Sequence, residues 1–96
     1  MQNLIIDPGI GYGKTDNHNF EILENLSIFL DLGVPLLIGV SRKSLIQRFI
    51  NDNKYKALAS SVSLGINAYF KGANILRVHD VKETIDSINL FHRVGI

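Results

Sequence analysis

Three short apolar runs divide the chain into repeating units, and they constrain the fold more than any other feature of the sequence. The runs cover residues 4–6, 36–40 and 75–78, and Gly, Pro, Asn or Asp residues bound each of them. Their apolar residues are continuous rather than alternating, which is typical of strands buried on both faces in a parallel sheet. A polar loop and then a helical pattern follow each run. The sequence therefore predicts three successive βα units of an α/β protein.

The helical patterns between and after these runs have recognisable ends. An apolar stripe predicts a first helix from Asp16 or Asn17 to about Leu30, and Gly33 provides its stop. Further helices are predicted over residues 44–50, 56–70 and 82–93, the last with Asp80 as its N-cap. The spacing suits βα units but leaves a barrel segment and a doubly wound sheet as alternatives.

Composition limits the classes of protein to be considered. The 96 residues are 46% hydrophobic and carry a net charge of +1, which excludes a disordered segment and a basic surface for nucleic acid. Cysteine is absent, so disulfides and thiolate metal sites are excluded, and a reducing compartment fits. No leader opens the chain, and charged residues interrupt every apolar run before membrane-spanning length. We therefore expect one small cytoplasmic domain over residues 1–96, with no nucleic-acid or membrane partner.

Polar residues follow the first strand, in the loop 7–15. Asp7 can accept paired hydrogen bonds from the ring N–H and amino group of a heterocycle, or it can simply start a turn before Pro8. The glycines at positions 9, 11 and 13 do not fit a dinucleotide fingerprint. Residues 13–15 nearly complete a phosphate loop, but Pro8 stands where its first glycine belongs and offers no N–H to a phosphate.

Cations follow the other two strands. Residues 41–44 read Ser-Arg-Lys-Ser, which indicates an anion or aromatic-ring contact, or else an ordinary charged first turn. Arg77 and His79 share one face of the third strand and form a candidate phosphate site. If the strands are parallel, Asp7, Lys43, Arg77 and His79 converge at one rim. No His and acid pair has metal-ligand spacing, so we expect no metal held by this chain.

These loops together resemble the dihydropteroate synthase family. Residues 7–14 with 18–19 are similar to its sixth-strand signature, residues 41–44 to its seventh-strand loop, and residues 72–81 to its eighth strand. The resemblance implies a TIM (β/α)₈ barrel, of which this chain would supply strands 6 to 8. It also implies a transferase of folate biosynthesis, which condenses p-aminobenzoate with dihydropterin methyl diphosphate and releases pyrophosphate with the help of Mg²⁺.

The resemblance also implies a role for each matched residue. Asp7 and Lys43 would bind the pterin, and Arg77 and His79 the diphosphate. Four residues would border p-aminobenzoate: Tyr12, Ser41, Arg42 and Lys43. The family's main protein contact to Mg²⁺ has no counterpart here, because it belongs to the first strand.

The first five strands of such a barrel have no counterpart in the sequence. We therefore expect an incomplete pterin-binding domain that is inactive alone, with the missing strands supplied by self-association or by a complementary chain. One alternative is a standalone anion-binding, pterin-binding or interaction module without catalysis. A nucleotide-binding α/β protein that uses Lys14 is a further alternative.

Overall fold

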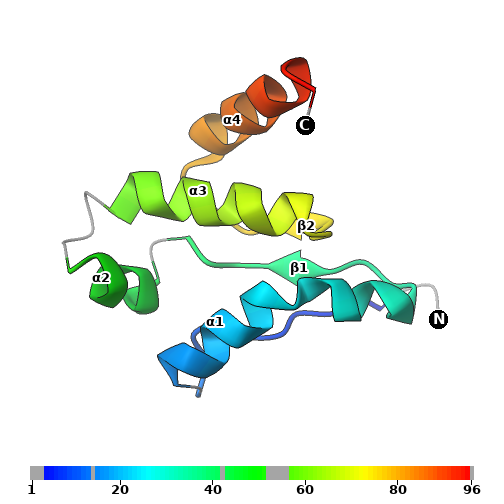
Figure 1. The fold of residues 1–96 in the computed structure, drawn as a ribbon, viewed down its shortest axis with the longest axis vertical. Helices are drawn as coiled ribbons and strands as arrows, with labels where there is room; N and C mark the ends of the chain where they lie inside the picture. Colours follow the sequence, from blue (N-terminus) through cyan, green and yellow to red (C-terminus); the bar gives the residue numbers. More distant parts are fainter. Residues whose placement is uncertain (1–3, 14, 42, 52–56, 96) are drawn as a thin grey trace.

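The fold is an α/β segment in which helices follow short parallel strands (Figure 1). The computed structural model describes residues 4–13, 15–41, 43–51 and 57–95. The elements, in chain order, are α1 (Asp16–Glu24), the 3₁₀ helix η1 (Leu26–Leu32), β1 (Leu37–Ile38), α2 (Ser44–Ile50), α3 (Ala57–Phe70), β2 (Ile75–Leu76) and α4 (Val81–Arg93). The three predicted units thus follow in the predicted order.

The three apolar runs lie side by side and run parallel. Leu37 pairs with Ile75 and Ile38 with Leu76, whereas the first run joins β1 through a single bridge between Ile6 and Leu36. The amide N–H of Leu37 donates to the carbonyl of Ile6 at 2.8 Å. Each run therefore neighbours the next one in the sequence, and the prediction of a parallel sheet is confirmed.

The first helix differs from its prediction. It begins at Asp16 as expected, where the side chain of Thr15 accepts from the backbone N–H of His18 and caps the helix. It ends at Glu24, because the backbone N–H of Asn25 is shared between two carbonyls and the chain tightens into η1. The predicted continuous helix to Leu30 is therefore wrong, although Gly33 does end the segment in the left-handed conformation with φ 69°.

The remaining helices follow their predictions closely. α2 has the predicted bounds and ends where Asn51 takes a left-handed conformation with φ 52°. α3 ends at Phe70 as predicted, and its described part begins at Ala57, since the predicted start at residue 56 lies outside the described residues. α4 begins one residue early, with Asp80 in the predicted N-cap position.

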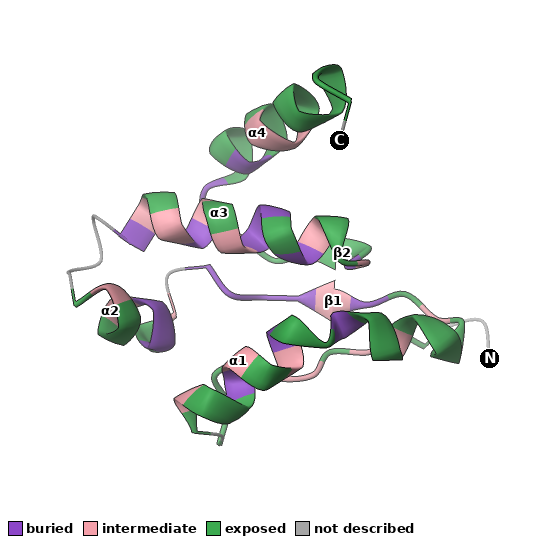
Figure 2. Ribbon diagram, in the orientation of Figure 1, coloured by how far each residue is buried: buried purple, intermediate pink, exposed green. Residues whose placement is uncertain are grey.

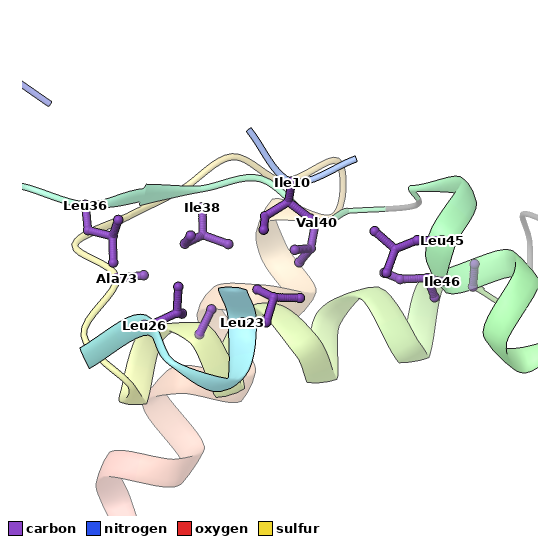
Figure 3. Close-up of a cluster of buried hydrophobic side chains, with 11 residues drawn as sticks. Ile10, Leu23, Leu26, Leu36, Ile38, Val40, Leu45, Ile46 and Ala73 are labelled. Atoms are coloured by element: carbon purple, nitrogen blue, oxygen red, sulfur yellow. The ribbon is translucent and has the colours of Figure 1, made fainter. Parts of the chain in front are cut away.

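A core of aliphatic side chains lies between the strands and the helices (Figure 3). Alternate residues of the β1 segment, Leu36, Ile38 and Val40, are almost fully buried in it together with Ile10 and Leu26. Because successive side chains of a strand point to opposite faces, Leu37 and Gly39 belong to the other face.

The opposite face of the sheet carries partly exposed apolar side chains in the described residues. Ile5 is 54% exposed and Ile75 is 37% exposed. Figure 2 shows that α4 also leaves most of its surface exposed, and Thr84 is its one buried residue. The core therefore sits on one side of the sheet, while Ile5 and Ile75 on the other side remain partly exposed.

None of the described helices is both long enough and apolar enough to cross a membrane.

Candidate functional site

The loops that follow the three parallel apolar runs line a cleft of about 420 Å³. In α/β proteins the carboxyl ends of parallel strands carry the ligand sites, so the cleft lies where a site is expected. Its walls come from all three loops and are formed by Tyr12, Gly39, Ser41, Lys43, Ser44, Arg77, Val78 and His79.

The first loop is folded tightly on its own backbone. The carboxylate of Asp7 accepts from the N–H of Gly9 at 2.9 Å, and the N–H of Tyr12 donates to the carbonyl of Gly9 at 3.0 Å. Gly9 and Gly11 have φ values of 73° and 88°, which favour glycine. Ile10, between them, is 2% exposed and anchors the loop in the core. Both interpretations of Asp7, as turn former and as site carboxylate, are therefore compatible with its geometry.

A buried asparagine holds this loop to α1. Asn19 is 1% exposed, and its Oδ1 accepts from the N–H of Gly11 at 2.9 Å. Its Nδ2 donates to the carbonyl of Thr15 at 3.1 Å. Because both ends of the amide are used, Asn19 ties the glycine loop to the start of the helix.

Arg77 crosses the middle strand to reach Asp7. Its Nη1 lies 3.6 Å from Oδ2 of Asp7, although the two residues follow the segments that pair with β1 on its opposite sides. Glycine leaves room for this crossing, because a Cβ at Gly39 would lie 2.7 Å from Nη2 of Arg77 and would displace the guanidinium. Gly39 thus provides the passage that places a guanidinium next to the carboxylate.

His79 is held by the loop after β1. Its backbone N–H donates to Oγ of Ser41 at 3.0 Å, and its Nδ1 lies 3.0 Å from the same oxygen. Ser41 is buried, whereas the imidazole is exposed. Two loops that are 38 residues apart are therefore joined directly beneath the ring.

Lys43 and Tyr12 form the remaining wall. Nζ of Lys43 lies 4.2 Å from the centre of the Tyr12 ring, a distance typical of a cation–π contact. The stem of Lys43 passes over Gly11, where a Cβ would lie 3.3 Å from Cδ. Tyr12 is 61% exposed.

The four residues expected to converge are therefore close together. Asp7, Lys43, Arg77 and His79 all contact or line the same cleft region. Two further predicted cations, Arg42 and Lys14, lie outside the described residues. A second hollow of similar size between α1, α2 and α3 is lined by apolar and small polar residues with no charged side chain among those described. The charged groups thus favour the cleft as the chemical site.

A family model described as "Pterin binding enzyme" matches residues 1–79. The chain belongs to the pterin-binding enzyme family. Relatives include the dihydropteroate synthase of Escherichia coli, 40% identical over 89 residues, which are 93% of this chain and 32% of the relative. That of Haemophilus influenzae is 41% identical over 90 residues, 94% of this chain and 33% of the relative. The chain spans about a third of the length of the curated relatives it matches.

Solved structures of pterin-binding enzymes share the fold of this chain. The dihydropteroate synthase of Stenotrophomonas maltophilia, with imidazole bound in its active site, has a TM-score of 0.91 and 42% identity over 96% of this chain and 35% of that one. That of Xanthomonas albilineans, in complex with 7,8-dihydropteroate, has a TM-score of 0.93 and 37% identity over 99% of this chain and 37% of that one. Because these enzymes are TIM barrels, the α/β segment described above matches part of a barrel.

Gly39, which lines the cleft, and Asn19, which supports its first loop, were given no role of their own from the sequence. Gly39 had a usable signal, because a glycine inside a strand often marks a close approach of another group. Ser44 belongs to the Ser-Arg-Lys-Ser motif that the sequence did indicate, and it lines the cleft. The structural role of Asn19 had no signal apart from its place in the matched motif.

Proposed function

We propose that this chain is the part of a dihydropteroate synthase barrel that contains strands 6 to 8. In the proposed reaction p-aminobenzoate condenses with dihydropterin methyl diphosphate to give dihydropteroate and pyrophosphate. The contact of Arg77 with Asp7 across Gly39 carries the proposal, since a carboxylate suited to a heterocycle and a cation suited to an anion then lie side by side. Family membership and the relatives that bind dihydropteroate and 4-aminobenzoic acid support it.

Each wall of the cleft has a proposed ligand. Asp7 accepts from the ring N–H and amino group of the pterin, with Lys43 beside it. Arg77 and His79 donate to the diphosphate oxygens. Four residues border the aminobenzoate: Tyr12, Ser41, Arg42 and Lys43. Two of them, Tyr12 and Lys43, form the cation–π contact described above.

The chemistry needs charge stabilisation more than a strong base. The amine nitrogen of p-aminobenzoate bonds to the methylene carbon of the pterin, while the bond from that carbon to the diphosphate oxygen breaks. Pyrophosphate leaves with the bonding electrons, and the amine loses one proton. Because negative charge grows on the leaving group, donors such as Arg77 lower the barrier.

The described residues do not fit a magnesium ion held by this chain. Mg²⁺ prefers six oxygen ligands, carboxylates and phosphates foremost. The cleft has one described carboxylate nearby, that of Asp7, and it already contacts Arg77 and the N–H of Gly9. In the described ranges no three His, Asp or Glu residues lie close enough to hold a metal. Any magnesium of the reaction would depend on groups outside these residues.

The open face of the sheet supports an incomplete barrel. In the described residues, β2 pairs with β1 alone, and the Ile6 segment likewise pairs on one side. Open parallel edges and exposed Ile5 and Ile75 need further strands to cover them. We propose that self-association or a complementary chain supplies these strands, that the segment alone is inactive, and that the assembly works in the cytoplasm.

Complementation tests the proposal. The chain is mixed with a polypeptide covering the part of the Escherichia coli relative that has no match here, and dihydropteroate formation is measured. We expect no turnover from either part alone, turnover from the mixture, and its loss with Asp7→Ala. Turnover by this chain alone would disprove the requirement for further strands. A compact monomer with ligand binding but no complementation would favour a standalone binding module instead.

A further inference from the structure

We propose that Ser41 is a positioning residue that fixes the tautomer of His79. In this arrangement the neutral imidazole carries its proton on Nε2 and donates it to an anion in the cleft. The inference deepens the proposed function, which identifies the anion as a diphosphate. It gives Ser41 a second role, in addition to its proposed place at the border of p-aminobenzoate.

The side chain of Ser41 is largely buried, and its hydroxyl bonds to His79. Ser41 is 7% exposed and lies where the chain turns from β1 toward α2. A hydroxyl that is this far buried is expected to make hydrogen bonds, and the protein groups around it are the first candidates. In the described part of the chain its hydrogen bonds go to two groups of one residue, the backbone N–H and Nδ1 of His79, both at 3.0 Å.

The hydrogen-bonding capacity of Ser41 favours one arrangement of the protons. A serine hydroxyl has one hydrogen to donate and two lone pairs. The backbone N–H of His79 can only donate, so it occupies one lone pair of Oγ. If Nδ1 also donated, the hydroxyl hydrogen would have no acceptor among the described residues. The hydroxyl therefore donates to Nδ1, and the ring proton resides on Nε2.

This arrangement determines what the ring can do. An Nε2–H group is a donor, and a neutral ring with an occupied Nδ1 has no accessible nitrogen that accepts a proton. His79 is thus suited to phosphate oxygens rather than to general-base catalysis. Arg77, which lines the same cleft, also presents donors only. The two side chains together form an anion site that requires no charge on the imidazole.

Nitrogen NMR on histidine-labelled chain tests the inference at pH about 8, where free imidazole is neutral. His79→Gln assigns the ring signals. We expect the wild type to contain one tautomer, with Nδ1 shifted as a hydrogen-bond acceptor. In Ser41→Ala this shift is lost and both tautomers are present, whereas Ser41→Thr, which keeps the hydroxyl, restores the wild-type signals. Identical ring signals in wild type and Ser41→Ala would overturn the inference.

Ligand titrations separate this inference from the proposed function. We expect Ser41→Ala to weaken inorganic pyrophosphate binding about tenfold, as for one misplaced hydrogen bond, and Ser41→Thr to restore it. If the wild type does not bind pyrophosphate while the tautomer result holds, the diphosphate role fails and the positioning role stands. If Ser41→Ala weakens p-aminobenzoate alone and leaves the ring signals unchanged, Ser41 belongs to the aminobenzoate subsite and the inference is wrong.

Discussion

Replacing Gly39 by alanine adds one methyl group where the side chain of Arg77 crosses β1. The new Cβ would lie 2.7 Å from Nη2 and 3.0 Å from both Cζ and Nε. Non-bonded heavy atoms pack best at about 3.5–4.0 Å, so the guanidinium must move by roughly 1 Å. The movement takes it away from its position beside Asp7.

The stability of the fold should hardly change. The side chains of Arg77 and Asp7 are 53% and 38% exposed, and solvent screens such pairs to about 0.2–1 kcal/mol. Alanine in place of glycine contributes about 0.4–1 kcal/mol in the other direction where φ is ordinary. Gly39 is not one of the described glycines with positive φ. We therefore expect the free energy of unfolding to stay within about 1 kcal/mol of wild type.

Anion binding should change much more. A hydrogen bond to a charged group contributes about 1.5–3 kcal/mol, which corresponds to about 10- to 150-fold in affinity. We expect calorimetric titration with pyrophosphate to show a loss in this range for Gly39→Ala, with little further loss when Arg77→Ala is added. Unchanged affinity, or destabilisation above about 2 kcal/mol, would refute the idea that Gly39 acts through the guanidinium.

A matched substitution controls for the chemistry of glycine replacement. Gly65 is buried in α3, and a Cβ there would lie 3.9 Å from Cδ1 of Leu76, an ordinary contact. Gly65→Ala should stabilise the helix by up to about 1 kcal/mol and leave pyrophosphate affinity unchanged.

Three further predictions follow from the packing and charges. Asn19→Ala leaves the N–H of Gly11 without its Asn19 partner. We therefore expect urea unfolding to show a loss of about 1–3 kcal/mol in unfolding free energy, together with weaker ligand binding. Wild-type values for both would contradict the role of the amide. Leu26→Ala, at a fully buried position, should cost about 2–5 kcal/mol of unfolding free energy, and a loss below about 1 kcal/mol would place Leu26 outside the core. Hydrogen bonds from Arg48, and then its charge, lower the pKa of Asp16 below 3.8. The resulting stabilisation of the folded state is present above pH 3.8 and is lost as the pH falls through the lowered pKa. NMR titration of Arg48→Gln should therefore show the pKa of Asp16 rise toward 3.8. An unchanged pKa would refute the pairing.

The sequence could predict the strands and most helix ends because those features are local. Continuous apolar runs bounded by glycine and proline mark the strands, and Gly33 and Asn51 end their segments by taking left-handed conformations. The change to η1 at Leu26 could not be foreseen. Apolar spacing of three residues fits both helix types, and the sharing of the Asn25 N–H between two carbonyls is a detail of the folded backbone.

The convergence of the site could be predicted, but its contacts could not. Parallel strands bring their following loops to one rim, which is why Asp7 and Arg77 could be placed near each other. Their contact depends on the space over Gly39, and the link from Ser41 to His79 joins loops 38 residues apart. Such contacts depend on register and side-chain reach, which no short motif encodes.

Titration of the nitrogen-labelled chain with dihydropterin methyl diphosphate tests whether the three loops form one binding site. We expect the amide signals of Gly11, Gly39 and His79, one from each loop region, to move together with one dissociation constant. We also expect Asp7→Ala to weaken the affinity. Movement of signals in one loop alone, separate constants for the loops, or no movement at saturating ligand would contradict a single site built from three strand ends.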